Sequence, residues 1–233
     1  MDYLIAATPR VGSNLLCSLL MGTQRLGECR EALCPSEFGE FAERIQRDRR
    51  AFQAYYAARR ARESKGGPFG VKAHFHQLVH AVELGFDLGA NFPSRVVYLR
   101  RADVVGQAIS HVRAAQTGAW ISRKEERAEP RFDPEAIHRA IGENADHEHG
   151  WESFFRQNDV LPYRLGYESL CADFEGELTR LLPFLGVDPG TVDVARVVAS
   201  STSALKKQRD GLSDEWRARY TEWIAGRSMA TAA

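Results

Sequence analysis

The chain begins with an apolar strand pattern that runs through a glycine-bearing turn into an apolar helix pattern. Residues 2–7 predict a short buried strand, residues 8–14 a turn, and residues 15–20 the start of a helix. The first N–H groups of a helix have no intrahelical partner and point at whatever occupies such a turn. Gly12 lets the backbone approach an anion closely, and Arg10 adds a planar fork of donors. A phosphate-like or sulfate-like ligand is therefore expected here, with a plain tight turn as the alternative.

The turn also carries the side-chain donors Ser13 and Asn14. It is not a Walker A loop, because that loop needs G-x-x-x-x-G-K followed by Ser or Thr, and the chain contains no such segment. The sequence therefore disfavours hydrolysis of a magnesium-bound nucleotide. A small-molecule kinase remains the alternative enzyme class.

Composition limits the remaining classes. A chain of 233 residues with 44% hydrophobic residues predicts a single domain over residues 1–233 with a substantial core. A formal net charge of zero argues against a general nucleic-acid surface, so any anion site must be local. We expect neither a secretory signal nor a membrane span, and the four cysteines lack zinc or redox spacing. A cytoplasmic protein is expected.

Strand patterns alternate with helix patterns along the chain, which predicts an α/β fold with a mostly parallel sheet and helices on both faces. Further strands are expected at 69–73, 95–100 and 161–167, and further helices at 36–63, 77–84, 103–116, 134–157, 174–185 and 192–199. A charged surface loop is expected at 122–131. After the last predicted helix, a polar tail anchored by Trp216, Tyr220 and Trp223 is expected. Ligands of such folds bind beyond the carboxyl ends of the strands.

A second anion site is expected after the strand at 95–100. Arg101 directly follows this strand, and Ser110 lies nine residues later on the next predicted helix. Both side chains can reach a second phosphate beside the first. The alternative is a surface arginine and a serine bonded to its own helical turn.

The two sites together resemble the nucleotide site of sulfotransferases, and more closely that of the bacterial trehalose 2-sulfotransferase family. Residues 8–16 read T-P-R-V-G-S-N-L-L, against T-P-R-S-G-S-T-L-L in that family. Residues 101–120 follow its R-P-D-V-V-x-Q-A-x-S-x-x-R-A-x-Q-T-x-x-W pattern. Residues 208–216 resemble its Q-A-D-Q-R-S-D-E-W segment, and residues 147–151 its E-E-G-W. The resemblance covers most of the chain.

The resemblance implies a P-loop-like three-layer fold and the donor 3′-phosphoadenosine 5′-phosphosulfate (PAPS). The residues implied to bind the donor are Arg10, Gly12, Ser13 and Asn14 for the 5′-phosphosulfate, Arg101 and Ser110 for the 3′-phosphate, and Arg209 in the late matching segment. Arg10 is further expected to stabilise charge on the bridging oxygen. Two departures, Val11 and Asn14, are expected to weaken donor binding.

Two residues compete for the role of catalytic base. Residues 27–31 resemble the family's G-E-P-Q-E, which makes Glu31 the base. Ala32 and Leu33 then stand where the family has two aromatic residues, which predicts a less aromatic acceptor pocket. His74, in a K-x-H pattern resembling that of animal cytosolic sulfotransferases, is the alternative base.

No metal is expected, because the histidines of the H-x-H-x₃-H segment at 74–80 and of the H-x-H at 147–149 lack a convincing acidic partner and are interpreted as surface residues. The predicted function is sulfuryl transfer from PAPS to a hydroxyl of a sugar, glycolipid or other small acceptor. A non-catalytic nucleotide-binding relative is the alternative outside the enzymes. The predicted partner is this small-molecule or glycan acceptor, and a homodimer is left open.

Overall fold

The computed structural model describes residues 2–120, 127–203 and 211–231. Within these ranges five strands form one parallel sheet in the order β2-β3-β1-β4-β5. The strands are β1 Tyr3–Ala7, β2 Cys29–Arg30, β3 Gly70–His74, β4 Arg95–Arg100 and β5 Tyr163–Gly166. The predicted parallel α/β fold is confirmed. Because every strand runs the same way, the loops after β1, β3 and β4 all emerge at one edge.

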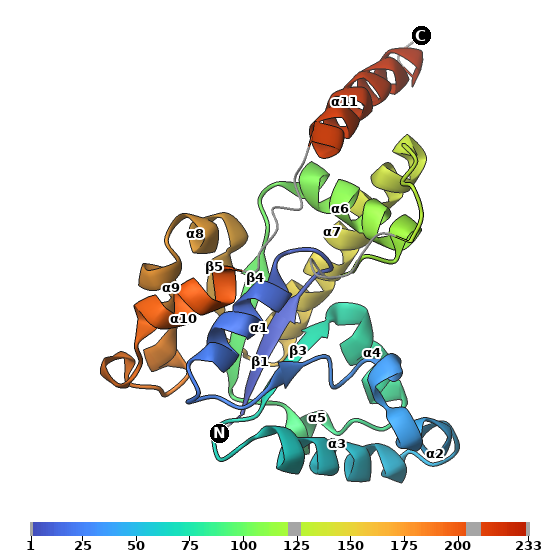
Figure 1. Ribbon diagram of the computed structural model, residues 1–233. Helices are drawn as coiled ribbons and strands as arrows, with labels where there is room; N and C mark the ends of the chain where they lie inside the picture. Colours follow the sequence, from blue (N-terminus) through green and yellow to red (C-terminus); the bar gives the residue numbers. More distant parts are fainter. Residues whose placement is uncertain (1, 121–126, 204–210, 232–233) are drawn as a thin grey trace.

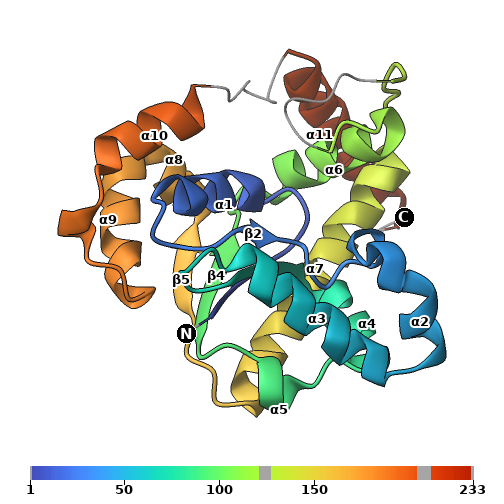
Figure 2. The ribbon, with the colours of Figure 1, turned by 60° about the horizontal axis from the view of Figure 1, so that its bottom comes forward.

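Helices cover both faces of this sheet (Figure 1, Figure 2). The α-helices are α1 Ser13–Gly22, α2 Ala42–Arg47, α3 Arg50–Glu63, α4 Phe75–Glu83, α5 Leu88–Asn91, α6 Val104–Thr117, α7 Pro134–Gln157, α8 Tyr167–Ala172, α9 Phe174–Phe184, α10 Val194–Thr202 and α11 Gly211–Thr231. Short 3₁₀ turns lie at η1 Pro35–Glu37, η2 Gly39–Phe41 and η3 Pro189–Thr191.

Alternate residues of the central strand β1 enter two different cores, as the pleat of a strand requires. Tyr3 and Ile5 pack with apolar residues of α1, α9 and α10. Leu4 and Ala6 pack with residues of α3, α4 and α7 on the opposite face. The result is the three-layer arrangement that the sequence predicts.

The prediction of a single helix over residues 36–63 is wrong. The segment instead forms two 3₁₀ turns, α2 and α3, with a break at Asp48. Asp48 has extended backbone angles (φ −140°, ψ 111°) and its side chain accepts a hydrogen bond from the N–H of Arg50. This local bond competes with the helix, which is the usual behaviour of aspartate.

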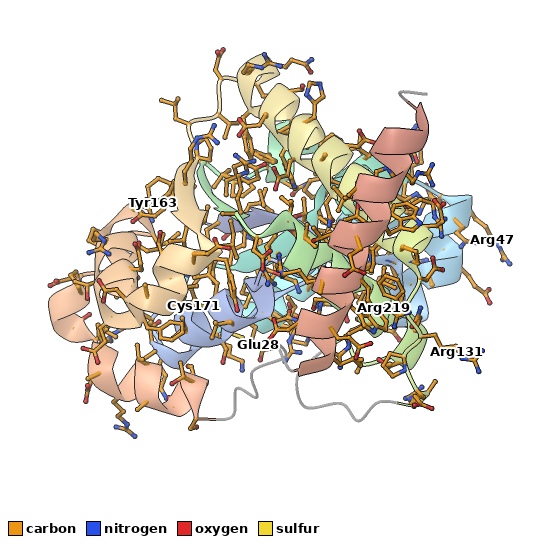
Figure 3. The ribbon with its side chains drawn as sticks, turned by 90° about the horizontal axis from the view of Figure 1, so that it is seen from above. Glu28, Arg47, Arg131, Tyr163, Cys171 and Arg219 are labelled. Carbon is orange, nitrogen blue, oxygen red and sulfur yellow. The ribbon has the colours of Figure 1, made fainter. Side chains whose placement is uncertain are left out.

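Residues 211–231 of the predicted polar tail form the long helix α11. Its anchors are as predicted: Trp216 and Tyr220 are buried in a third core with residues of α6 and α7, and Trp223 is partly buried against it. Figure 3 shows α11 from above with Arg219 on it, and Arg219 lies 4.0 Å from the Phe132 ring centre. Of the surface loop predicted over residues 122–131, residues 122–126 lie outside the described ranges.

Candidate active site

The turn between β1 and α1 has the geometry of an anion-binding loop. Arg10 and Gly12 have left-handed backbone angles, with φ of 66° and 88°. Gly12 occupies the N-cap position of α1 and supplies no capping side chain, so the first N–H groups of the helix face the turn. A Cβ at Gly12 would lie 2.5 Å from the Tyr167 ring, so this position needs glycine for two reasons.

Arg10 joins the loop to α6. Its Nε donates to the Ser110 hydroxyl at 2.9 Å, and its Nη1 donates to the Trp120 carbonyl. Burial and the neighbouring charge of Arg101 lower the pKa of Arg10. The two anion sites expected from the sequence therefore adjoin, since Arg10 of the first touches Ser110 of the second.

Arg101 lies directly after β4 and is mostly buried. Its Nη1 donates to the Arg10 carbonyl at 3.3 Å, its Nη2 lies 3.4 Å from an Asp103 carboxylate oxygen, and its guanidinium stacks 5.0 Å from the Tyr167 ring centre. Its buried Nε has no hydrogen-bond partner among the described residues. A buried charged donor without a partner is costly, so this nitrogen is available to an anion.

Gln107 fixes the loop from the α6 side. Its amide nitrogen donates to the Thr8 hydroxyl at 2.8 Å and to the Pro9 carbonyl at 2.7 Å. Gln107 is fully buried, so these two bonds replace the hydrogen bonds that its amide nitrogen would make to water in the unfolded chain. No feature of the sequence alone distinguishes Gln107 from its neighbours in the matching segment 101–120.

Lys72 is the most important residue that the sequence analysis missed. Its side chain, 5% exposed, reaches from β3 to Glu31 with an Nζ–Oε1 distance of 2.5 Å. It also donates to the Asn14 amide oxygen in the first turn of α1. A buried lysine with a carboxylate partner and an amide partner is a cation held in a defined place. The only sequence signal was a lysine inside an apolar strand, in the K-x-H pattern whose histidine alone was considered.

Glu31 is held on both oxygens. Lys72 pairs with Oε1, and the Gln77 amide donates to Oε2 at 2.7 Å. The other end of the Gln77 amide accepts from the His74 backbone N–H at 2.9 Å, which fixes the amide orientation. Burial raises the pKa of Glu31, but the charge and hydrogen bond of Lys72 outweigh it and leave the pKa below its usual value. Glu31 is therefore ionised at neutral pH.

His74, the second candidate base, ends β3 at the same edge. It is buried, not a surface residue as expected, and its Nδ1 lies 3.3 Å from the Ala7 carbonyl oxygen. Burial lowers the pKa of His74 to about 4, so the ring is neutral at neutral pH. If Nδ1 donates to Ala7, Nε2 is left as the proton-accepting atom.

Several other expectations from the sequence concern residues that lie away from this site or outside the described ranges. Ala32 and Leu33 are fully buried in the core between the sheet and α3, so they do not form a pocket wall. Arg209 lies outside the described residues. Within the described ranges no group of three or more His, Cys, Asp or Glu residues has the geometry of a metal site. None of the described helices is long and apolar enough to cross a membrane.

Fold and site together define a P-loop-like α/β protein with an anion-binding loop and no Walker lysine in that loop. The sequence profile of the Stf0 sulphotransferases matches residues 87–222, which is more than half of the chain. The chain belongs to the Stf0 sulphotransferase family, and the resemblance seen in the sequence is confirmed.

Individual relatives agree with this placement. The trehalose 2-sulfotransferase of Mycobacterium tuberculosis (strain Erdman) is 29% identical over 130 residues, which are 53% of this chain and 44% of the relative. The protein of the same name from Mycolicibacterium smegmatis is 32% identical over 129 residues, which are 54% and 45% of the two chains. The matched region thus spans less than half the length of these relatives.

The fold is also that of a known sulfotransferase structure. The crystal structure of mouse sulfotransferase SULT7A1 complexed with PAP superposes with a TM-score of 0.54 over 90% of this chain and 67% of the mouse chain. Sequence identity is 16%, so the comparison concerns the fold alone.

Proposed function

We propose that this protein is a sulfotransferase that moves a sulfuryl group from PAPS to a hydroxyl of a sugar or another small acceptor. One observation carries the proposal: Arg10 of the loop contacts Ser110 of α6, while Lys72 links Asn14 of the same loop to the carboxylate of Glu31. An anion site therefore adjoins an ionised base. Family membership supports the reaction, and the names of the two mycobacterial relatives support a sugar acceptor.

The donor-binding residues fit a ligand with two anionic ends. Arg10, Gly12, Ser13 and Asn14 surround the uncapped start of α1, which favours one phosphate-like group. Ser110 and Arg101, whose Nε has no hydrogen-bond partner in the part of the chain that the structure describes, suit the second. The donor supplies the sulfuryl group, and the bound PAP of the mouse structure supports a ligand of this class. Arg209 stays a predicted contact.

Glu31 is the proposed base and Lys72 its positioning partner. An acceptor hydroxyl must lose its proton as it attacks, and an ionised carboxylate fixed on both oxygens can take that proton. Lys72 keeps Glu31 ionised and sets a positive charge between the base and the loop, where charge on the transferred group needs stabilisation. His74 is the alternative base, since its neutral ring can accept a proton and lies at the same edge.

Two measurements test this function. Labelled PAPS is incubated with trehalose, other sugars, glycolipids and small alcohols, and transfer of label to one of them is expected. Separately, adenosine 3′,5′-bisphosphate should raise the melting temperature by mass action, whereas AMP, which lacks the 3′-phosphate, should do much less. Arg101→Met should remove this difference. Equal shifts from both nucleotides, or none, would refute the donor site, and bisphosphate binding without any transfer would support a non-catalytic relative.

A further inference from the structure

The buried face of α7 turns polar in its middle. At one end of this face Ile137 packs against α6 and α11, and at the other end Trp151 packs against the sheet. Between them, at helical spacing, lie Asn144 and His147. Asn144 is 7% exposed, and neither its amide nitrogen nor its amide oxygen has a partner among the described residues. A buried amide with no hydrogen bond destabilises a fold, so such a position calls for a functional explanation.

Imidazole rings of α4 and α6 lie close to His147, which is one helical turn from Asn144 on α7. His76 of α4 and His147 of α7 have ring centres 4.9 Å apart, and His74 lies 5.9 Å from His76 on the other side. His111 of α6 packs edge-on against Trp120 at 5.7 Å. The Nδ1 atoms of His111 and His147 are buried and, within the described ranges, unpartnered. We call His76, His111, Asn144 and His147 the imidazole cluster.

The cluster borders the proposed active site. Trp151 donates from its indole nitrogen to the Ala7 carbonyl, where β1 ends. His147 and Asn144 precede Trp151 by one and two helical turns, or about 6 and 10 Å along α7, which brings them beyond the carboxyl edge of the sheet. His111 follows Ser110, the partner of Arg10. The cluster therefore reaches from the Glu31 side of the site to the Arg10 side.

The imidazoles of the cluster are neutral at neutral pH. Burial lowers the pKa of His76, His111 and His147, and the neighbouring imidazoles act in the same direction on His76 and His111. Arg10 also lowers the pKa of His111, whereas Glu31 opposes the shift at His76 and Glu143 opposes it at His111 and His147. A neutral imidazole offers one donor and one acceptor, and an amide offers both. These groups match hydroxyls, which also donate and accept, better than they match a fixed charge.

We propose that the imidazole cluster is the subsite that binds the non-reacting hydroxyl groups of a neutral saccharide acceptor. This inference rests on the proposed function, because it assumes that the acceptor's reacting hydroxyl lies at Glu31. The cluster contributes affinity and selectivity for the acceptor, and the donor residues are separate from it.

The test measures sugar binding to histidine-labelled protein that is loaded with adenosine 3′,5′-bisphosphate. NMR of the histidine ring signals monitors the binding. Trehalose, maltose and glucose are added in turn. At least one should shift the ring signals of His76, His111 and His147 and leave those of exposed His149 unchanged. His147→Leu should weaken that sugar's binding about tenfold, as loss of one or two hydrogen bonds predicts, while His147→Gln should retain most of it.

Two further variants separate binding from structure. His149→Leu, two residues away on the same helix, is the matched control and should bind sugar normally. Asn144→Leu should raise the melting temperature, because it removes two buried polar atoms that have no partner among the described residues. It should nevertheless weaken sugar binding and raise the acceptor KM with little change in kcat. A purely structural asparagine would not give this combination.

The outcomes distinguish the inference from the function on which it rests. If the bisphosphate binds but none of the three sugars shifts the cluster's signals, the subsite is refuted and the donor site stands. If sugar binding falls equally in His149→Leu and His147→Leu, the subsite is also refuted. If the bisphosphate itself does not bind, the proposed function fails, and the inference fails with it.

Discussion

At the scale of single residues, the site depends on a few buried polar groups that hold one another in place. Lys72 pairs with Glu31 and bonds Asn14, and Gln77 connects Glu31 to the start of α4. Buried charges of this kind are stable only in pairs, because each alone would have to give up its hydration without compensation. Replacing one member should therefore change the chemistry of the others.

Replacing Glu31 should affect turnover far more than donor binding. Glu31→Gln is expected to lower kcat by roughly 10² to 10⁴, the usual size of a general-base effect. Affinity for adenosine 3′,5′-bisphosphate should stay the same or rise, because Lys72 loses its carboxylate partner and keeps its charge beside Asn14. Steady-state kinetics and calorimetry measure the two quantities. His74→Ala should lower kcat less than Glu31→Gln does. A large loss of kcat in His74→Ala, with normal kcat in Glu31→Gln, would instead identify His74 as the base.

His74 should make the folded protein less stable in acid. Burial lowers the pKa of His74 to about 4 in the folded protein, against 6.5 for an unperturbed histidine. The unfolded chain binds a proton as the pH falls through 6.5, whereas the folded chain does so only near pH 4. The free energy of unfolding therefore falls by about 3 kcal/mol over that window, about 2 kcal/mol of it by pH 5. Urea denaturation at pH 7.5 and pH 5 measures this loss. The loss should shrink in His74→Gln and persist in the exposed control His80→Gln; equal losses in all three would contradict it.

At the scale of elements, the start of α1 depends on a glycine that no other residue can replace without strain. Gly12→Ala is expected to destabilise the fold by about 1–3 kcal/mol, because alanine is disfavoured at φ 88° and its Cβ would meet Tyr167. It should also weaken bisphosphate binding, which thermal shift measures. The matched control is Gly142→Ala, in the interior of α7 with open space around it, which should be neutral or stabilising. Equal effects of the two changes would show that the loop conformation is unimportant.

Elements with a strong local pattern could be predicted from the sequence. The apolar run at 95–100 predicted β4 with its observed bounds. The helix pattern at 134–157 predicted α7 with its observed bounds, and this helix starts at Pro134 after Asp133, whose side chain accepts from the Ala136 N–H. β2 was not predicted, because a strand of two residues is too short to show an alternating apolar and polar pattern. Residues 36–63 were misread as one helix because apolar residues at helical spacing continue across the break at Asp48.

The site was predictable only in part, for a similar reason. The loop around Arg10 and the segment after β4 carry local patterns, and the parallel sheet brings their ends together. Lys72 acquires its place from the sheet order, in which β3 lies beside both β1 and β2. No local pattern in the sequence specifies that order, so its contacts with Asn14 and Glu31 could not be anticipated. The imidazole cluster likewise needs three helices in their final positions.

At the scale of the whole molecule, α11 connects the C-terminal part of the chain to the proposed donor side of the site. Arg217 donates to both carboxylate oxygens of Asp103 at 2.6 and 2.7 Å, and Asp103 accepts from Gly106 at the start of α6. Trp216 is fully buried against α6 and α7. Loss of α11 packing should therefore disturb α6, which carries Ser110 and Gln107.

Trp216→Ala tests this connection. It should destabilise the protein by about 3–5 kcal/mol, the usual cost of removing a large buried side chain. Weaker bisphosphate binding should accompany the loss, because α6 loses its support. Denaturation and thermal shift measure both effects, with Leu161→Ala as control, since Leu161 is 91% exposed and should change stability little. Normal stability in Trp216→Ala would mean that α11 contributes little to the folded state.

The order of the strands has a consequence for the synthesis of the chain. β1 leaves the ribosome first, yet it lies at the centre of the sheet, with Tyr3 opposite Gly70 on one side and Arg95 on the other. At synthesis rates of about 5–20 residues per second, roughly 5–20 seconds pass before both neighbours of β1 exist. Until β3 is made this apolar strand has two open hydrogen-bonding edges, and until β4 is made it still has one, the condition under which nascent chains aggregate or need a chaperone. Slow or impaired pairing of β1 with β3 and β4 would therefore appear as insoluble protein rather than as folded but inactive protein.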